Sequence, residues 1–212
     1  MLINLPLPID GDSAKAFALR ERYSQQDQTL SLAGMTWSDF EEFISEEYLG
    51  YRVSYLDGVI TLVSPSKNHE RIAEVIGDLV KAYCRKYNVL YFPLGSTTLK
   101  HPPLAGKEPD VSFAFDTDKD LPDLAIEVVF SSGGITDLKK YQILGVKEVW
   151  FWENNLITFH HLQGNNYQEI TRSICLPNLC SADLISFVNR GLIESPLIIE
   201  ADFIKQLANT SN

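Results

Sequence analysis

The sequence predicts an α+β fold with a central mixed β-sheet flanked by helices and with an N-terminal β-hairpin. Three observations carry this prediction: a long amphipathic helix pattern at 67–87, several β-rich runs after it, and two β-rich runs around Asp57-Gly58 before it. Helices and strands in this irregular order are typical of α+β proteins. A chain of 212 residues with 45% apolar side chains is long enough for one domain with a substantial core.

The first 34 residues show no long periodic pattern, and we interpret 1–34 as an N-terminal extension. The domain itself is predicted for 35–190. Thr36 can cap its first helix, in which Trp37, Phe40 and other apolar residues share one face. The runs YRVSYL and VITLV then flank Asp57-Gly58, a dipeptide that strongly indicates a β-hairpin.

The clearest helix is predicted from Lys67 to Tyr87, where apolar residues keep the i, i+3, i+4 spacing. The runs VLYFP, STTLK, PDVSFAF and DLAIEVVF follow and indicate strands. A helix at 136–144 is expected to end on Gly145. EVWFW and LITFHHL form a further hairpin pattern, and two helices are expected at 181–189 and 195–207. We interpret 191–212 as a C-terminal helical extension.

Composition restricts the classes of function. With 18 basic and 28 acidic residues the net charge is −10, whereas proteins that wrap nucleic acid are usually basic. Any contact with DNA therefore needs a local patch. The three cysteines, Cys84, Cys175 and Cys180, contain no CxxC pair, which favours a reducing compartment. No apolar run approaches the ~20 residues of a membrane span, and the first residues lack a signal-peptide pattern, so we expect a cytoplasmic protein.

Glu127 is the most informative single residue. It lies in the run LAIEVVF, which reads as a strand that is buried on both faces. An unpaired carboxylate in such a strand would cost several kcal/mol or become protonated. We therefore expect a cation beside Glu127, either a metal ion or a lysine. An ordinary salt bridge to lysine or arginine, or exposure at the strand end, explains the sequence about equally well.

Asp110 is the second candidate, because Pro109-Asp110 opens the next strand-like run upstream. An aspartate before a strand is common, so it is informative only together with Glu127. Two carboxylates at the ends of successive strands, with the main-chain carbonyl of Val128, suit Mg²⁺ or Mn²⁺. Glu70 on the long helix is a further acid that would act through a water, whereas the residues themselves slightly favour a solvated first-turn glutamate that serves the helix dipole.

The chain contains a set of motifs that match one known pattern: Pro109-Asp110, PDLAIEVV at 122–129, SGGI at 132–135, YQILGVKEVW at 141–150, YLDG at 55–58, SPS at 64–66, HE at 69–70 and GSTT at 95–98. Together these motifs resemble the Uma2 family of restriction-endonuclease-like proteins. The resemblance covers 36–190. It implies a restriction-endonuclease-like PD-(D/E)XK core in which Asp110 and Glu127 bind the metal and Glu70 is the helical acid. It also implies a divalent-metal-dependent endonuclease that hydrolyses phosphodiester bonds in DNA.

The sequence departs from that pattern at the lysine. Val129 occupies the position two residues after the second acid, and Asp137 stands where relatives carry a lysine on the following helix. Lys140 lies one helical turn further on and shares the face of residue 137, so we expect it to replace the missing base. The alternative is that Lys139 and Lys140 are both surface charges.

The sequence is compatible with three functions. The first is the metal-dependent endonuclease, and the second is a catalytically impaired member that acts as a nucleic-acid or protein interaction module. The third is an enzyme acting on another phosphorylated substrate through the same metal site. We also expect a homodimer, because two-fold dimers are the commonest oligomers, with the aromatic segment EVWFW at 148–152 supplying part of the contact.

Overall fold

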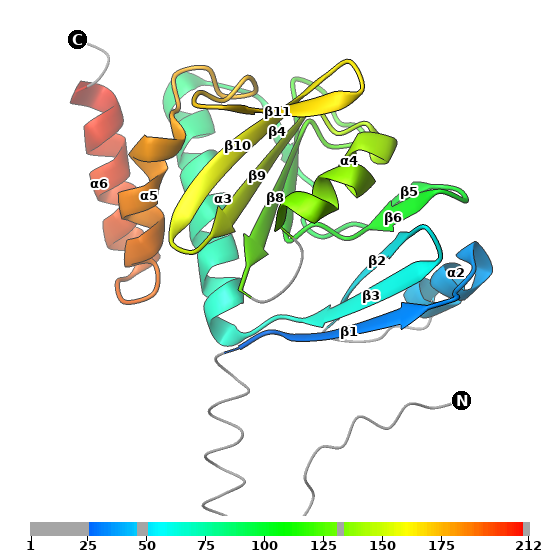
Figure 1. Cartoon of the computed structure of the whole chain (residues 1–212). Coiled ribbons are helices and arrows are strands. Elements are labelled where there is room, and N and C mark those ends of the chain that lie inside the picture. Colours follow the sequence, from blue (N-terminus) through cyan, green and yellow to red (C-terminus); the bar gives the residue numbers. More distant parts are fainter. Residues whose placement is uncertain (1–25, 46–50, 131–133, 210–212) are drawn as a thin grey trace, which may run out of the picture.

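The computed structural model describes residues 26–45, 51–130 and 134–209. Within these residues the chain forms an α+β fold with two β-sheets and five α-helices (Figure 1). The predicted α+β class is therefore confirmed. The predicted N-terminal hairpin is present, but it belongs to a second sheet rather than standing alone beside a single central one.

The smaller sheet is antiparallel and has the strand order β1-β3-β2-β6-β5. Its strands are β1 (Gln28–Ala33), β2 (Arg52–Leu56), β3 (Val59–Ser64), β5 (Leu99–His101) and β6 (Ala105–Lys107). The strand β1 lies within the segment 1–34, where the sequence shows no long periodic pattern. Leu30 and Leu32 alternate with polar residues there, a period-two pattern that is too short to stand out in the sequence. Residues 1–25 of the predicted extension lie outside the described residues.

The hairpin between β2 and β3 turns at Asp57-Gly58, as the sequence predicts. Both residues have positive φ, 49° and 78°, which suits the tight turns that join twisted antiparallel strands. One face of this sheet is apolar and packs on helix α2 (Trp37–Ser45), whose Phe40 is fully buried. The opposite face is polar and is turned toward the rest of the molecule.

The close approach of Phe40 to β6 gives a testable prediction for Gly106. A Cβ atom on residue 106 would lie 2.2 Å from Cζ of Phe40, whose side chain is 0% exposed and packs in the core between the smaller sheet and α2. We expect Gly106→Ala to lower the free energy of unfolding by about 1–3 kcal/mol in urea titrations. Gly77→Ala is the control, because its Cβ would make only an ordinary 3.5 Å contact in a helix and should stabilise slightly. Equal stability of the Gly106→Ala variant and the parent would contradict the packing.

The larger sheet is mixed and has the order β11-β10-β9-β8-β7-β4. Its strands are β4 (Tyr91–Pro93), β7 (Val111–Phe115), β8 (Leu124–Val129), β9 (Glu148–Glu153), β10 (Leu156–Gln163) and β11 (Asn166–Ile170). The strands β8 and β9 are parallel and all other neighbours are antiparallel. Parallel pairing requires a crossover, which the 3₁₀-helix η1 (Gly134–Asp137) and helix α4 (Leu138–Leu144) provide.

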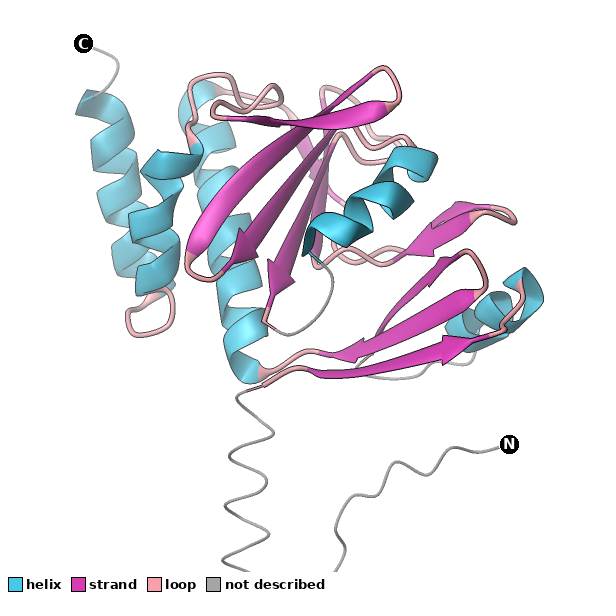
Figure 2. Ribbon diagram, viewed as in Figure 1, coloured by secondary structure: helices cyan, strands magenta, loops and turns pink. Residues whose placement is uncertain are grey.

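Helices cover both faces of this sheet (Figure 2). One face packs on α3 (Lys67–Tyr87), which is joined by α5 (Ser181–Arg190) and α6 (Pro196–Asn209), and α4 packs on the other. The helix α3 begins where predicted, because the Ser66 side chain accepts a hydrogen bond from the His69 N–H at 3.2 Å. The expected stop at Gly145 is confirmed, with φ 81° and its N–H bonded to the Tyr141 carbonyl.

The EVWFW segment is interior, which corrects its expected role in a subunit contact. It forms most of β9, between β8 and β10, and Trp150, Phe151 and Trp152 are 1–3% exposed. Alternate side chains enter the cores on the two faces of the sheet. Among the described residues, none of the helices combines the length and the apolar character needed to cross a membrane. The division of the chain into 1–34, 35–190 and 191–212 stays a prediction.

Candidate functional site

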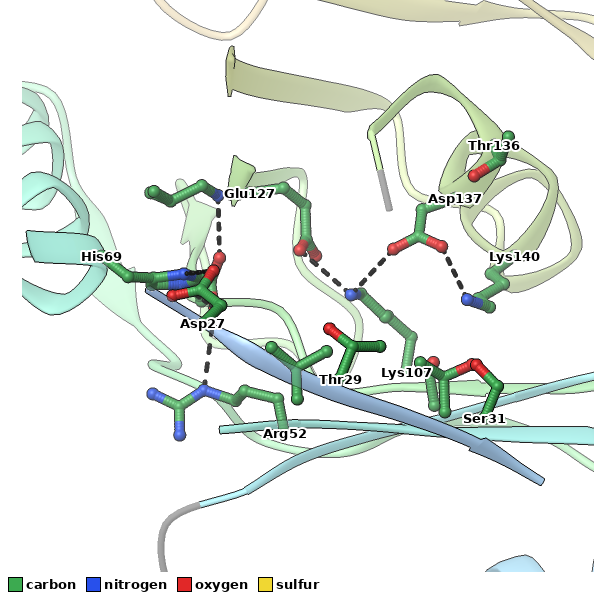
Figure 3. A pocket seen from close by; sticks show the side chains of 15 residues that line it. Asp27, Thr29, Ser31, Arg52, His69, Lys107, Glu127, Thr136, Asp137 and Lys140 are labelled. Atoms are coloured by element: carbon green, nitrogen blue, oxygen red, sulfur yellow. Dashed lines mark hydrogen bonds and ion pairs between the residues drawn. The ribbon is translucent and has the colours of Figure 1, made fainter. Parts of the chain in front are cut away.

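A polar cavity of about 190 Å³ lies between the two sheets (Figure 3). The smaller sheet and the residue before it contribute Asp27, Thr29, Ser31, Arg52, Ser54, Thr61, Val63 and Lys107. The opposite wall consists of His69, Asp110, Glu127, Val128, Thr136, Asp137 and Lys140. The cavity therefore gathers residues that lie far apart in the sequence, including both acids that the sequence singled out.

Asp110 is fixed at the entrance of β7. Its Oδ2 accepts a hydrogen bond from the Val128 N–H at 2.8 Å, which ties it to the neighbouring strand β8. Its Oδ1 lies 2.9 Å from His69 Nε2 and 3.8 Å from Arg52 Nε. Only 4% of this side chain is exposed, and the carboxylate is held by one hydrogen bond from Val128 between the nearby cationic groups of His69 and Arg52.

His69, in the first turn of α3, lies between the carboxylates of Asp27 and Asp110. Its Nδ1 is 2.8 Å from Asp27 Oδ2, and its Nε2 faces Asp110. Burial acts to lower the pKa of His69, but Asp110 and Asp27 outweigh it and raise this pKa to about 10. The ring is therefore an imidazolium at neutral pH, and it adds a positive charge to the cavity wall.

Glu127 projects from the buried strand β8 toward a lysine. Its Oε2 is 3.0 Å from Lys107 Nζ, and the Tyr141 hydroxyl donates to its Oε1. Burial raises the pKa of Glu127 to about 7; the Lys107 ammonium acts in the opposite direction, and Asp110 and Asp137 add to the rise. Asp110 and Glu127 line the same cavity, so the two acids share one electrostatic environment.

Lys107, Asp137 and Lys140 form a chain of alternating charges beside Glu127. Asp137 Oδ2 lies 3.0 Å from Lys107 Nζ, and its Oδ1 lies 2.6 Å from Lys140 Nζ. Burial opposes ionisation of Asp137, but the two ammonium groups hold its pKa down to about 2. Lys107, rather than the expected substitute base Lys140, is thus the lysine that contacts Glu127. Asp137 lies one turn before Lys140 and draws the Lys140 ammonium to itself.

Glu70 lies outside the cavity, in contrast to the helical acid expected from the sequence. Its side chain is 52% exposed, and its Oε1 contacts Arg52 Nη2 at 3.4 Å. Successive helical residues point about 100° apart, so when His69 faces the acids Glu70 turns toward solvent. His69 is therefore the residue of α3 that reaches the site.

The acids fit a hard divalent cation by their chemistry. Mg²⁺ in proteins commonly binds one or two carboxylates and keeps several waters, and Asp110 and Glu127 offer two carboxylates in one polar cavity. Within the described part of the chain no three His, Cys, Asp or Glu residues cluster closely enough to hold a metal alone. The structure shows the Val128 N–H bonded to Asp110, and the Val128 carbonyl as a third ligand stays a prediction.

A family model described as Uma2, putative restriction endonuclease, matches residues 37–177. The chain belongs to the Uma2 family. A similar fold is found in the crystal structure of a putative nuclease belonging to DUF820 from Anabaena variabilis ATCC 29413. The two share 14% sequence identity with a TM-score of 0.51, over 73% of this chain and 99% of that one. No match was found among curated proteins.

The Uma2 match confirms the family that the sequence motifs resemble, and its range includes both acids and Lys107. Asp27 and β1 precede the matched range, so this part of the cavity is supplied by residues outside it. Sequence reasoning missed Asp27, Arg52 and Lys107 as cavity residues. The sequence signal for such a partner was Glu127 itself, because a buried carboxylate requires a nearby cation. That signal does not identify which residue supplies the cation.

Proposed function

We propose that this Uma2 protein is a divalent-metal-dependent endonuclease with a PD-(D/E)XK core that hydrolyses phosphodiester bonds in DNA. The observation that carries the proposal is the meeting of Asp110, Glu127 and Lys107 in one small cavity. This places two carboxylates and one ammonium group together although they come from β6, β8 and the start of β7. The family match supports a nuclease, and the similar solved structure supports the fold.

In this proposal Asp110, Glu127 and the Val128 carbonyl hold Mg²⁺ or Mn²⁺. Such an ion, when bound, supplies an activated water and neutralises charge on the phosphate. The protein contributes orientation, because the Val128 N–H and His69 hold Asp110 while Tyr141 holds Glu127. The Lys107 ammonium lies beside Glu127 and stabilises negative charge that develops on the phosphate oxygens. Lys140 positions Lys107 through their shared partner Asp137.

Plasmid cleavage tests this function directly. We expect the purified protein to nick supercoiled plasmid DNA with Mg²⁺ or Mn²⁺ but not with EDTA. Glu127→Gln should abolish nicking and weaken Mn²⁺ binding measured by calorimetry, because a neutral amide is a poorer ligand for a hard cation. Unchanged Mn²⁺ affinity in this variant, or nicking that persists in EDTA, would contradict the assignment.

The charge balance of the cavity favours a second candidate function. Among the described lining residues, Asp27, Asp110, Glu127 and Asp137 face the four cations of Arg52, His69, Lys107 and Lys140. A metal ion therefore has to share carboxylate oxygens that protein cations already contact. A catalytically impaired Uma2 member, retained as a nucleic-acid or protein interaction module, would show no cleavage with any divalent ion.

The homodimer remains part of the proposal, because a two-fold pair suits the two strands of a duplex. The interior position of the EVWFW segment means that another surface must supply the contact.

A further inference from the structure

The polar face of the smaller sheet carries a row of hydroxyl groups that leads to Lys107. Cross-strand pairing places Ser31 of β1 opposite Thr61 of β3, Thr61 opposite Ser54 of β2, and Ser54 opposite Lys107 of β6. Directly paired residues project from the same face of a sheet, and all four line the cavity. The sheet therefore presents three hydroxyls and one ammonium in a line across four adjacent strands. We call these four residues the hydroxyl row.

The hydroxyl row runs from solvent into the site. Ser31 is exposed on the edge strand and Thr61 is half-buried, whereas Ser54 and Lys107 are 5% and 7% exposed. The Ser31 and Thr61 side-chain oxygens lie 3.5 Å apart, and the inner end of the row lies 3.0 Å from Glu127 Oε2. An extended ligand that lies along the row would thus reach the acids with its inner end.

The chemistry of the row suits the oxygen atoms of an anionic backbone. Hydroxyls donate hydrogen bonds to phosphate and sugar oxygens without reading bases, and no carboxylate interrupts the row. The opposite face of the same strands is apolar and buried against α2, so hydroxyls on the cavity face are not required by the packing of that core. A cavity of about 190 Å³ is below the ~300–1,000 Å³ of pockets for drug-sized ligands, and it suits a phosphodiester group rather than a whole nucleotide.

We propose that the hydroxyl row is a binding track for the sugar–phosphate backbone of one DNA strand, which delivers a phosphodiester group to Asp110 and Glu127. This inference rests on the proposed nuclease function and adds the surface and the part of the substrate that it binds. The second row of the same face, Thr29, Val63 and Arg52, lies alongside and ends on the guanidinium near Asp110. Recognition through these groups is independent of base sequence.

The track can be tested by binding without cleavage. A fluorescein-labelled single-stranded oligodeoxynucleotide is titrated with full-length protein in EDTA and followed by anisotropy over a range of salt concentrations. The test variant is Ser31→Ala with Thr61→Val, which removes two hydroxyls outside the acidic centre and nearly preserves side-chain volume. The matched control is Ser38→Ala with Thr117→Val, which removes the same groups from exposed positions away from the cavity. Thermal melting checks that both variants are folded.

We expect the test variant to bind the oligonucleotide about tenfold more weakly than the parent, and the control to bind like the parent. The slope of log Kd against log salt should stay unchanged, because hydroxyls release no counterions, whereas Arg52→Gln should reduce the slope by about one. Equal binding by test and control variants, or no binding by the parent, would overturn the track. If the parent nicks plasmid and the test variant binds the oligonucleotide like the parent, the track is refuted and the nuclease function stands. If the test variant binds more weakly but the parent does not cleave plasmid with any divalent ion, the nuclease function is refuted and the binding track stands.

Discussion

Replacing Lys107 by methionine is expected to lower the free energy of unfolding by about 3–5 kcal/mol. The ammonium lies 3.0 Å from both Glu127 and Asp137, and these side chains are less than 10% exposed. Removing it leaves the buried carboxylates of Glu127 and Asp137 with Lys140 as the one close ammonium partner of Asp137 among the described residues. Breaking a buried charge pair from one side has a cost of this size because the remaining charge is neither solvated nor paired.

Urea unfolding at pH 7 measures this effect, and two further variants make it specific. The double change of Lys107→Met with Glu127→Gln should recover much of the loss, since it removes one of the uncompensated charges. Lys139→Met is the matched control, because Lys139 pairs with Asp57 at the surface and both side chains are more than half exposed. That variant should stay within about 1 kcal/mol of the parent. Equal losses for Lys107→Met and Lys139→Met would contradict the buried charge chain.

Besides Glu127→Gln, Asp110→Asn is expected to have a large effect on activity. The amide keeps the shape of the side chain and an oxygen for the Val128 N–H, but it loses the charge that attracts a cation. A lost metal ligand removes several kcal/mol of transition-state stabilisation, so we expect plasmid nicking to fall about a thousandfold. Initial rates at saturating Mn²⁺ give the comparison.

Glu70→Gln is the control that separates the site from its surroundings. This glutamate is the neighbour of His69 in the sequence, yet its side chain is half exposed and lies outside the cavity. Its variant should nick plasmid at the parental rate. A comparable loss of activity in Glu70→Gln would show that Glu70, the helical acid expected from the sequence, participates in the reaction. It would contradict the assignment of His69 as the residue of α3 that reaches the site.

Local patterns were sufficient to predict most of the fold. Asp57-Gly58 specifies its turn through positive φ angles, and the spacing of apolar residues at 67–87 specifies α3, because both signals depend on neighbours within a few residues. The strands β1 and β6 were missed because neither has a local pattern strong enough to identify it. The three residues of β6 are too few to show alternation, and β1 becomes a strand through its pairing with β3.

The candidate site was predictable only in part, because its contacts join distant segments. The sequence indicates Asp110 because it is an acid at the start of a strand, and Glu127 because it is an acid inside a buried strand. The partner of Glu127 lies 20 residues away, on β6 of the other sheet, and Asp27 lies 42 residues before His69. Lys140 had the right helical spacing from residue 137, but the acid at that position became its partner. Spacing along one helix cannot reveal a competing cation, here Lys107, that lies on a strand of another sheet.

We propose that Asp110 and Glu127 form a metal-binding nuclease centre with Lys107 beside it. A crystal soaked in Mn²⁺ and measured at a wavelength where manganese scatters anomalously tests this proposal. We expect an anomalous peak in the cavity between the sheets, bonded to carboxylate oxygens of both Asp110 and Glu127. A cavity without that peak at millimolar Mn²⁺, with Lys107 still seated between Glu127 and Asp137, would contradict it.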